Sequence, residues 1–290
     1  MKSLWLSPAK LNLFLHITGQ REDGYHLLQT VFQFLDYSDQ LLFETRNDDV
    51  IALENSLPGV ADEDNLIIRA ARKLQAYSTS KKGKRGANIQ LLKKLPMGGG
   101  LGGGSSNAAT TLLALNHLWQ LDLTTDELKS IGLELGADVP IFIHGEACVA
   151  EGIGEQFTNI ELEPCWYLVL VPNCQVNTGE IFSDPTLTRN SKTIRIRTSL
   201  NWAFLGTLRN DCEAVVKKRY PEVNQALEWL SQYGIARMTG TGCCVFTSFP
   251  SEQEARKIAT LLPKSMQAFV ARGVNKSPAQ STLLSTDYIG

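Results

Sequence analysis

The fourteen residues from Pro96 to Ala109, PMGGGLGGGSSNAA, hold six glycines and run directly into a helical pattern. Each ordered glycine costs roughly 0.5–1 kcal/mol of folding free energy relative to alanine. So many glycines in one loop indicate that its backbone closely approaches another group. Ala108, Leu112, Leu115 and Trp119 then recur on one face of a predicted helix. Unpaired N–H groups and a partial positive charge at a helix N-terminus attract anions. The stretch predicts a phosphate site, with a flexible hinge or a glycine-packed turn as the alternative.

Other phosphate loops fit this stretch poorly. A Walker A loop has lysine and then serine or threonine after its last glycine, whereas Gly103 is followed by Gly104 and Ser105. The spacing GxGxxG is met trivially in so glycine-rich a run, and a second helix occupies the place where a dinucleotide fold needs a strand ending in an acidic residue. The chain also lacks the HRD and DFG motifs of protein kinases.

Phosphoryl transfer needs a cation and a carboxylate beside such a loop, because its catalysis depends on positioning and charge neutralisation. Lys10 begins an alternating pattern over Leu11–Ile17, which predicts a strand with a second, partly polar face that also carries Asn12. Asp138 precedes Pro140, and we expect it at the edge of a strand over 141–150. Taken singly, Lys10 is more typical of a solvated strand lysine and Asp138 of a turn or cap aspartate, and the functional interpretation depends on their occurring together with the glycine loop.

The remaining pattern predicts the elements that position these residues. The N-terminal part is rich in predicted strands, and the C-terminal part reads as helix, two strands around a glycine turn, helix and strand, which is typical of an α+β sandwich. The basic segment with Lys81, Lys82, Lys84 and Arg85 could hold a phosphate but is more typical of a solvated loop. The predicted strands cover 11–17, 30–35, 40–45, 50–53, 88–95, 141–150, 166–171 and two segments within 236–249, and the predicted helices cover 65–77, 105–119, 124–135, 210–219, 221–234 and 251–262.

Composition narrows the class of protein. At 290 residues the chain is long enough for about two domains, and its net charge of −2 provides no general attraction for nucleic acid or anionic membranes. The six cysteines have no CxxC spacing, which argues against a zinc site or a disulfide framework. With no signal-peptide pattern and no membrane-length apolar stretch, we expect a cytoplasmic protein.

Three ordered motifs together resemble the GHMP small-molecule kinases. They are SPAKLNLFLHITGQREDGYH from Ser7 to His26, the glycine loop, and TGTGCCVF from Thr239 to Phe246. The resemblance implies an α+β fold of two α/β layers, with an N-terminal domain like domain 2 of ribosomal protein S5 over 1–160 and a C-terminal ferredoxin-like domain over 161–290. The boundary could extend to about residue 185, and the active site would lie between the domains.

The resemblance also implies roles for individual residues. Lys10 and Asp138 match the catalytic pair, and ATP with Mg²⁺ would be the phosphate donor and its counter-charge. No metal ligand is marked, although Ser105 or Ser106 could reach the ion. The ATP cradle would comprise Pro96, Met97, Gly98, Gly99, Gly100, Leu101, Gly102, Gly103, Gly104, Ser105 and Ser106. The acceptor side would comprise Asn12, Tyr25, His26, Thr178 and Phe182, with Phe32 as a further wall or a core residue.

Within the family, the GYH and GADVP segments favour the branch that phosphorylates a hydroxyl of a diphosphocytidyl polyol in non-mevalonate isoprenoid synthesis. There the aromatics would sandwich the cytosine, and His26 would bind its polar edge. The alternatives are a GHMP kinase for another alcohol, such as homoserine or mevalonate, and a non-catalytic nucleotide- or RNA-binding module. The partner implied is a small molecule and neither a nucleic acid nor a membrane, and a homodimer is compatible with the resemblance.

Overall fold

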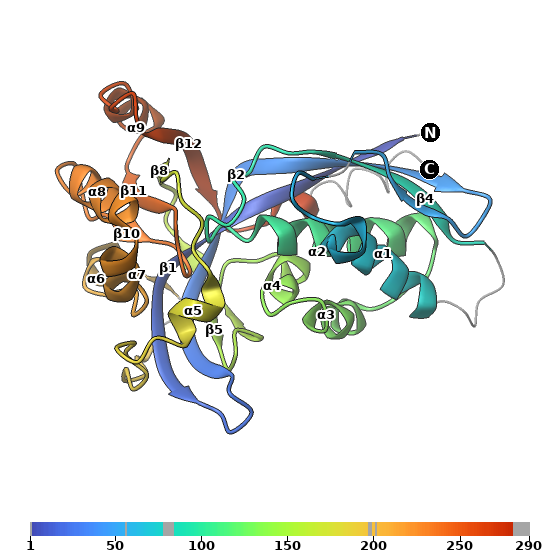
Figure 1. Cartoon of the computed structure of the whole chain (residues 1–290), viewed down its shortest axis with the longest axis horizontal. Coiled ribbons are helices and arrows are strands. Elements are labelled where there is room, and N and C mark those ends of the chain that lie inside the picture. Colours follow the sequence, from blue (N-terminus) through green and yellow to red (C-terminus); the bar gives the residue numbers. More distant parts are fainter. Residues whose placement is uncertain (1, 56, 78–83, 197–198, 201, 281–290) are drawn as a thin grey trace.

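A ten-stranded sheet forms the frame of the molecule in the computed structural model, which describes residues 2–55, 57–77, 84–196, 199–200 and 202–280 (Figure 1). Its main path has the order β10-β11-β8-β12-β2-β4-β3, with β1 and β5 also paired to β2, and β6 paired to β5. Its strands are β1 (Ser3–Gln20), β2 (His26–Arg46), β3 (Ile51–Leu53), β4 (Gly86–Leu92), β5 (Cys148–Glu151), β6 (Gln156–Asn159), β8 (Trp166–Val171), β10 (Arg237–Met238), β11 (Val245–Phe249) and β12 (Gln267–Val274), while β7 (Glu161–Leu162) pairs with β9 (Ser199–Leu200).

Strands β1 and β2 form one long antiparallel pair that reaches from the hairpin at the bottom of Figure 1 into the sheet above the helices. The prediction of two strands over 30–35 and 40–45 with a turn between them is wrong, because β2 continues without interruption. Its polar residues stay within the sheet: Ser38 pairs with Pro8 of β1, and Asp39 pairs with Ser7. The buried Asp39 carboxylate is satisfied by the N–H groups of Lys94 and Leu95, at 2.7 Å each, and by the Lys93 ammonium, also at 2.7 Å.

Helices of the N-terminal half cover one side of the sheet. In Figure 1 α1, α2, α3 and α4 all lie beneath β2 and β4, and their apolar faces share a core with Trp5, Phe34 and Phe43. The expected helix start at Thr124 is confirmed, because its hydroxyl and the Glu127 side chain form a capping box. The bounds are η1 (Asp62–Asp64, a 3₁₀ turn), α1 (Leu66–Tyr77), α2 (Gly103–Leu118), α3 (Thr125–Leu133) and α4 (Val139–His144).

Asp138 does not stand at the edge of a strand as predicted. The segment after it is helix α4, with Pro140 in its first turn, and the strand begins only at Cys148. Proline is well placed in a first helical turn, since its missing N–H would be unpaired there in any case. Gly145 ends the helix with φ of +71°, a conformation that favours glycine. The apolar residues after Asp138 therefore form a short buried helix where a strand over 141–150 was predicted.

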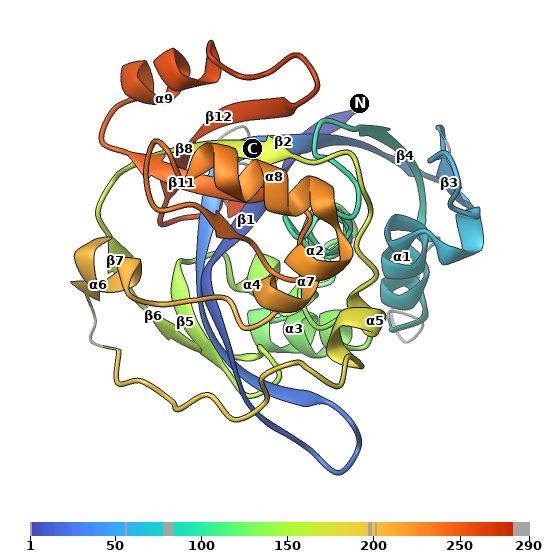
Figure 2. The same ribbon diagram turned by 60° about the vertical axis from the view of Figure 1, so that its left-hand side comes forward.

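In the C-terminal half, helices α8 and α9 pack on β8, β11 and β12 (Figure 2). The predicted strand over 166–171 and the helix starts at Pro221 and Ser251 are confirmed, and the Ser251 hydroxyl caps its helix by accepting from the N–H of Glu254. Strand β12 joins the halves, because it pairs with β8 along most of its length and with β2 at Gly273 and Val274. The helices are α5 (Thr178–Phe182), α6 (Trp202–Gly206), α7 (Glu213–Arg219), α8 (Pro221–Leu230) and α9 (Glu252–Ala259).

The observed α+β architecture confirms the predicted fold class. The division at 160/161 remains a prediction, and Lys81 and Lys82 of the predicted basic loop lie outside the described residues. Within the described ranges, every helix is too short or too polar to cross a bilayer.

Candidate active site

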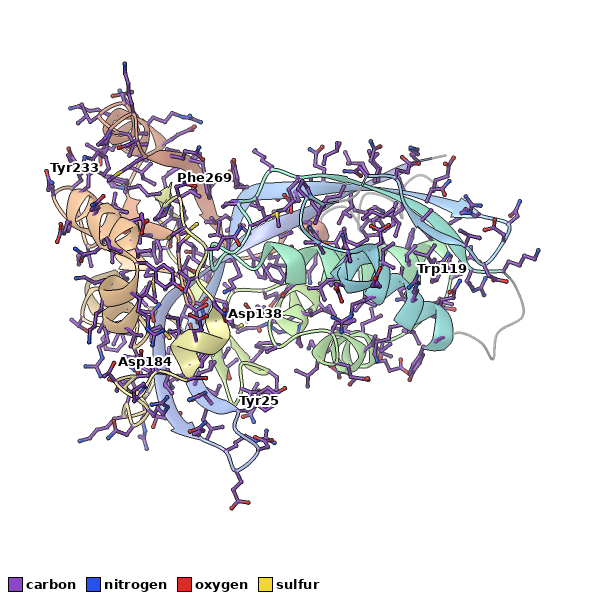
Figure 3. All side chains as sticks on the ribbon, in the orientation of Figure 1. Tyr25, Trp119, Asp138, Asp184, Tyr233 and Phe269 are labelled. Carbon is purple, nitrogen blue, oxygen red and sulfur yellow. The ribbon has the colours of Figure 1, made fainter. Side chains whose placement is uncertain are left out.

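A cavity of about 1190 Å³ lies where β1, the glycine loop and the loops of the C-terminal half come together. Lys10, Asn12, Asp138 and all of the loop from Pro96 to Ser105 line it, as do Tyr25, His26, Thr178 and Phe182. Sequence segments as distant as β1 and the turn at Gly240–Gly242 thus meet at one place. In Figure 3 Asp138 lies at the centre of the molecule, and Tyr25 lies below it near the β1–β2 hairpin.

The glycine loop ends in an open helix terminus. Gly102 is the N-cap of α2, with φ of +74° and no side-chain cap, and the first helical N–H with a backbone acceptor is that of Ser106, which donates to Gly102 O at 2.8 Å. The N–H groups of Gly103, Gly104 and Ser105 have no partner within a helix by geometry, and no acceptor in the described residues binds them. This terminus can therefore accept an anion.

Close backbone packing holds the loop in place and explains two of its glycines. Cys244 N–H donates to Gly99 O at 3.1 Å. A Cβ on Gly100, which has φ of +74°, would stand 2.2 Å from the carbonyl oxygen of Thr239. A Cβ on Gly99 would lie 2.6 Å from the Cys244 sulfur. The loop is therefore a packed structure with one open end, and the hinge alternative is excluded.

Lys10 is the cation of the site. Its side chain is 2% exposed, so the alternative of a solvated strand lysine is wrong. The ammonium donates to Asn12 Oδ1 at 2.5 Å and to Gly100 O at 3.1 Å, and lies 3.3 Å from Asp138 Oδ2. Two hydrogen bonds and the ion pair therefore hold the positive charge at a defined point beside the glycine loop.

Asp138 stands at the N-cap position of α4 but makes no capping hydrogen bond. The side chain therefore does not act as a helix cap, and that alternative is excluded. The carboxylate turns to Lys10 instead and remains 44% exposed toward the cavity. One oxygen is thus paired with a buried cation while the group stays accessible, an arrangement that can orient a hydroxyl and accept its proton.

Asn12 makes hydrogen bonds to residues of both halves of the molecule. Its amide nitrogen donates to Thr30 Oγ1 at 3.0 Å while its oxygen accepts from Lys10. Its backbone N–H donates to the hydroxyl of Thr239 at 3.0 Å. Asn12 therefore fixes Lys10 against β2 and against the glycine turn of the C-terminal half.

The predicted base pocket is assembled from the β1–β2 hairpin and α5. The His26 ring stacks on Phe182 with centroids 4.9 Å apart and an interplanar angle of 27°, while Tyr25 lies 57% exposed at the cavity wall. Thr178 is exposed and shares a hydrogen bond of 2.9 Å with the Thr241 hydroxyl. The structure brings these residues together, but it stacks Phe182 on His26, so the predicted sandwich between Tyr25 and Phe182 stays a prediction.

Two predicted contacts have positions that disfavour them. Ser106 is fully buried, does not line the cavity, and accepts a hydrogen bond from Ser7 at 2.9 Å. Phe32 is 2% exposed within the core and has Lys10 Nζ 5.3 Å from its ring centroid. Ser106 thus anchors α2 to β1, and Phe32 is a core residue whose edge reaches the cavity.

The sequence did not reveal two parts of the cavity wall: the part around Asn65, and the cation of Lys93 beside the open N-terminus of α2. Lys93 lines the cavity and lies 3.3 Å from the point where a Cβ on Gly103 would stand. Nearby, the Asn65 amide nitrogen is buried with no hydrogen-bond partner in the described structure, although its oxygen accepts from Ile67 N–H. The one sequence signal for Asn65 was its place at the start of a helix. The apolar lining there comes from Leu57, Val60, Leu66 and Ile67.

Two groups at or near the site have a lowered pKa. Desolvation, and secondarily the charge of Arg189, lowers the pKa of His26 below 6.5. Hydrogen bonds from the neighbouring thiols, Cys244 foremost, lower the pKa of Cys243 to about 7. His26 is therefore a neutral ring at pH 7.

Within the described ranges, no three His, Cys, Asp or Glu side chains are grouped to hold a metal ion.

The fold and this site define a small-molecule kinase, and the chain belongs to the GHMP kinase family. The model of the GHMP kinases N terminal domain matches residues 65–146, and the model of the GHMP kinases C terminal domain matches residues 190–268. ATP is accordingly the phosphate donor.

Curated relatives have a more specific name. A protein of Pseudomonas aeruginosa (strain UCBPP-PA14) is 57% identical over 93% of this chain and 94% of its own length. One of Marinobacter nauticus is 55% identical over 96% of both. Both are named 4-diphosphocytidyl-2-C-methyl-D-erythritol kinase.

Solved structures agree with this grouping. A crystal structure of 4-(cytidine 5'-diphospho)-2C-methyl-D-erythritol kinase superposes with a TM-score of 0.78 at 29% identity, covering 94% of this chain and 99% of the other. A mevalonate kinase structure has a TM-score of 0.68 at 17% identity, covering 94% and 99%, and this second likeness establishes the fold alone.

Proposed function

We propose that this protein transfers the γ-phosphoryl group of ATP to a hydroxyl, the 2-hydroxyl, of 4-diphosphocytidyl-2-C-methyl-D-erythritol, giving the 2-phosphate and ADP. The observation that carries the proposal is the Lys10–Asp138 pair at 3.3 Å, which lines the same cavity as the open terminus of α2 and the His26–Phe182 stack. Relatives more than half identical to this chain carry the name of that kinase. The pathway would be the non-mevalonate route to isoprenoid precursors.

The donor phosphates would bind at the terminus of α2. The N–H groups of Gly103, Gly104 and Ser105 can each donate to a phosphate oxygen there. Lys93 lines the same end and adds a cation whose charge is partly balanced, because its ammonium is paired with Asp39 Oδ2 at 2.7 Å. Because the N–H groups are fixed by the packed loop, they need no reorganisation as charge moves during transfer. Pro96 to Leu101 would form the remainder of the cradle.

The acceptor hydroxyl would lie at Asp138. An aspartate is too weak a base to ionise an alcohol beforehand, so in a loose transition state it orients the hydroxyl and takes the proton late. Lys10 stabilises the negative charge that develops between donor and acceptor and holds Asp138 in place. Asn12 keeps the ammonium directed at this point through the bond to its Oδ1.

Magnesium fits the donor end without a protein cage. Mg²⁺ usually binds phosphates, water and one or two protein oxygens, and the half-buried Ser105 hydroxyl lines the cavity at the terminus of α2. When bound, the ion would neutralise charge on the ATP phosphates.

The cytosine would bind at the other end of the cavity, near Tyr25, His26 and Phe182. Stacking on aromatic side chains suits a planar base and offers nothing to homoserine or mevalonate, which argues against these alternatives. A non-catalytic module would not need a buried lysine directed at an accessible carboxylate. A cytoplasmic location, a homodimer and the absence of a nucleic-acid partner remain predictions.

The decisive experiment is an ATP-consumption assay with four candidate acceptors: diphosphocytidyl-methylerythritol, homoserine, mevalonate and galactose. We expect turnover of the first alone. Turnover of another acceptor at comparable kcat/KM would reassign the substrate, and turnover of none would favour the binding module. The His26→Ala variant should raise KM for the cytidylyl substrate and leave KM for ATP unchanged, and equal losses for both would contradict the base pocket.

A further inference from the structure

Arg189 is a polar residue of the cavity wall that neither the motifs nor the reaction accounts for. It lies in the segment after α5, and its guanidinium makes hydrogen bonds to three backbone carbonyls: Leu187 O at 3.2 Å, Phe182 O at 2.8 Å and Asp184 O at 2.9 Å. The Asp184 carboxylate itself binds Arg219 instead. In the described residues Arg189 has no ion-pair partner, so the carbonyls near the C-terminal end of α5 hold its charge.

The fourth hydrogen bond of Arg189 reaches the base pocket. Its Nε donates to Nε2 of His26 at 3.1 Å. Because a guanidinium has only donors and stays protonated in proteins, Nε2 of His26 must be the acceptor and carry no proton. A neutral imidazole has one proton, so the proton is on Nδ1. The contact therefore selects one tautomer.

Protonation of the ring is opposed from several sides. A proton on Nε2 would place two donors against each other and set a second positive charge beside Arg189. Burial acts in the same direction, and together they lower the pKa of His26 below 6.5. One face of the His26 ring stacks on the uncharged ring of Phe182. Besides Asp138, the carboxylates that line the same cavity are Asp23 and Asp64. Neither acidic group is among the causes that shift His26.

The Nδ1–H group is what remains for a ligand. In the described part of the chain no acceptor binds it, and its ring lines the cavity. The ring can therefore donate to a ligand but cannot accept from one, since its only acceptor is used by Arg189. A pyrimidine is read through its Watson–Crick edge, where cytosine has an acceptor at N3 and uracil has a donor, N3–H.

We propose that Arg189 is a positioning residue that fixes His26 as an Nδ1–H donor directed at N3 of the base, so that the pocket selects cytosine and rejects uracil. This inference rests on the proposed function, because it takes the base pocket to be the one at Tyr25, His26 and Phe182. It goes beyond that function by assigning the selectivity to the ring's tautomer and the tautomer to Arg189. A free ring could reverse its tautomer and accept from uracil N3–H.

The tautomer can be measured without any substrate. Imidazole ¹⁵N spectra of the full chain contain only four histidines, and comparison with His26→Ala identifies the signals of residue 26. We expect Nδ1 to be protonated and Nε2 to be bare at pH 7.5. A dominant Nε2–H form, or an equal mixture, would overturn the proposal.

The variants Arg189→Met and Arg189→Lys then separate the tautomer from a structural effect. Methionine removes the donor and should give a mixed tautomer, whereas lysine keeps an obligate donor and should retain Nδ1–H. Binding of CDP and UDP, followed by calorimetry, supplies the second readout. We expect the wild-type preference for CDP to be roughly tenfold to a hundredfold, the cost of an unpaired buried polar group. The preference should fall several-fold in Arg189→Met and persist in Arg189→Lys.

Each failure has its own signature. If wild type binds neither nucleotide but shows the expected tautomer, the proposed function is at fault at the base pocket. If wild type prefers CDP but the preference is unchanged in Arg189→Met, the proposed role of Arg189 is wrong. Equal loss of CDP and UDP binding in both variants, with the wild-type tautomer retained, would reduce Arg189 to a structural clamp of α5 and also overturn the proposal.

Discussion

Lys10 and Asp138 form an ion pair with unequal exposure: the lysine side chain is 2% exposed, the aspartate side chain 44%, and their charged atoms are 3.3 Å apart. The cation is thus fixed by the protein, while the carboxylate can still reach a ligand. A pair that served stability alone would gain nothing from this asymmetry. The relationship instead suits a site in which the lysine holds charge and the aspartate meets the acceptor.

Replacing Asp138 by asparagine should lower kcat by roughly 10²–10⁴-fold, the usual contribution of a positioned acid or base. KM for ATP should change little, because the N–H groups at α2 are untouched. Steady-state kinetics with both substrates varied would test this. Asp126→Asn on the exposed face of α3 is a matched control that should behave as wild type. A near-normal kcat in Asp138→Asn would remove the residue from the mechanism.

Lys10→Met should lower kcat by roughly 10²–10³-fold, since it removes the charge that stabilises the transferred group. Lys10→Arg should rescue little of this loss. The planar fork of arginine cannot reproduce the two hydrogen bonds and the ion pair that one ammonium makes here, and the side chain is tightly enclosed, with Lys10 Cε 3.2 Å from the point where a Cβ on Gly102 would stand. Single-turnover rates would measure both variants. Recovery of most of the wild-type rate by arginine would show that charge alone suffices.

Two glycine-to-alanine substitutions in the loop should have opposite effects on stability. At Gly100 the new Cβ meets Thr239 O at 2.2 Å and the backbone has φ of +74°, so we expect a loss of about 2 kcal/mol or more. At Gly104, which lies inside α2, the new Cβ meets only Leu66 Cδ1 at 3.5 Å, and we expect a gain of about 0.5–1 kcal/mol. Urea unfolding without nucleotide would measure both changes, and equal shifts would contradict the described loop.

Asp39→Ala should destabilise the protein by about 3 kcal/mol, because the N–H groups of Lys94 and Leu95 lose their acceptor in a buried place and Lys93 loses its ion-pair partner. Since those residues lead into the glycine loop, KM for ATP should also rise. Asp36→Ala is the control: Asp36 also accepts a backbone N–H, that of Arg272, but at an exposed position, and its loss should cost less than about 1 kcal/mol. Equal costs for the two variants would argue against the anchoring role of Asp39.

Stability should fall as pH drops below 6.5, and His144 should contribute to this slope. Desolvation is the largest effect on its pKa and lowers it below 6.5, assisted by Lys129. The folded state then binds the proton less readily than the unfolded state, so stability is present above pH 6.5 and is lost as pH falls toward the folded pKa. Urea midpoints between pH 5 and 7.5 should fall less in His144→Gln than in wild type. Parallel curves would exclude His144 as a source of the slope.

Much of the site could be predicted because its chemistry is local in sequence. The glycine run indicated a helix N-terminus, and the apolar residues after it recur at helical spacing. Helix α2 and its unpaired N–H groups could therefore be predicted from the sequence pattern. Lys10 and Asn12 could be placed on one face of β1 because side chains alternate along a strand. The uninterrupted β2 could not be foreseen, because Asp39 looks like a turn residue until its acceptors meet Lys94 and Leu95 from another part of the chain.

By itself the sequence determined the glycine loop and the family, since these depend on residue types at fixed spacing, and on the same basis it predicted which residues react. The tertiary structure alone decided that Asp138 begins a helix and pairs with Lys10, that Ser106 is buried behind the loop, and that Arg189 holds His26. Each of these depends on which segments meet in space, and burial and hydrogen bonding between distant residues leave no periodic mark on the chain.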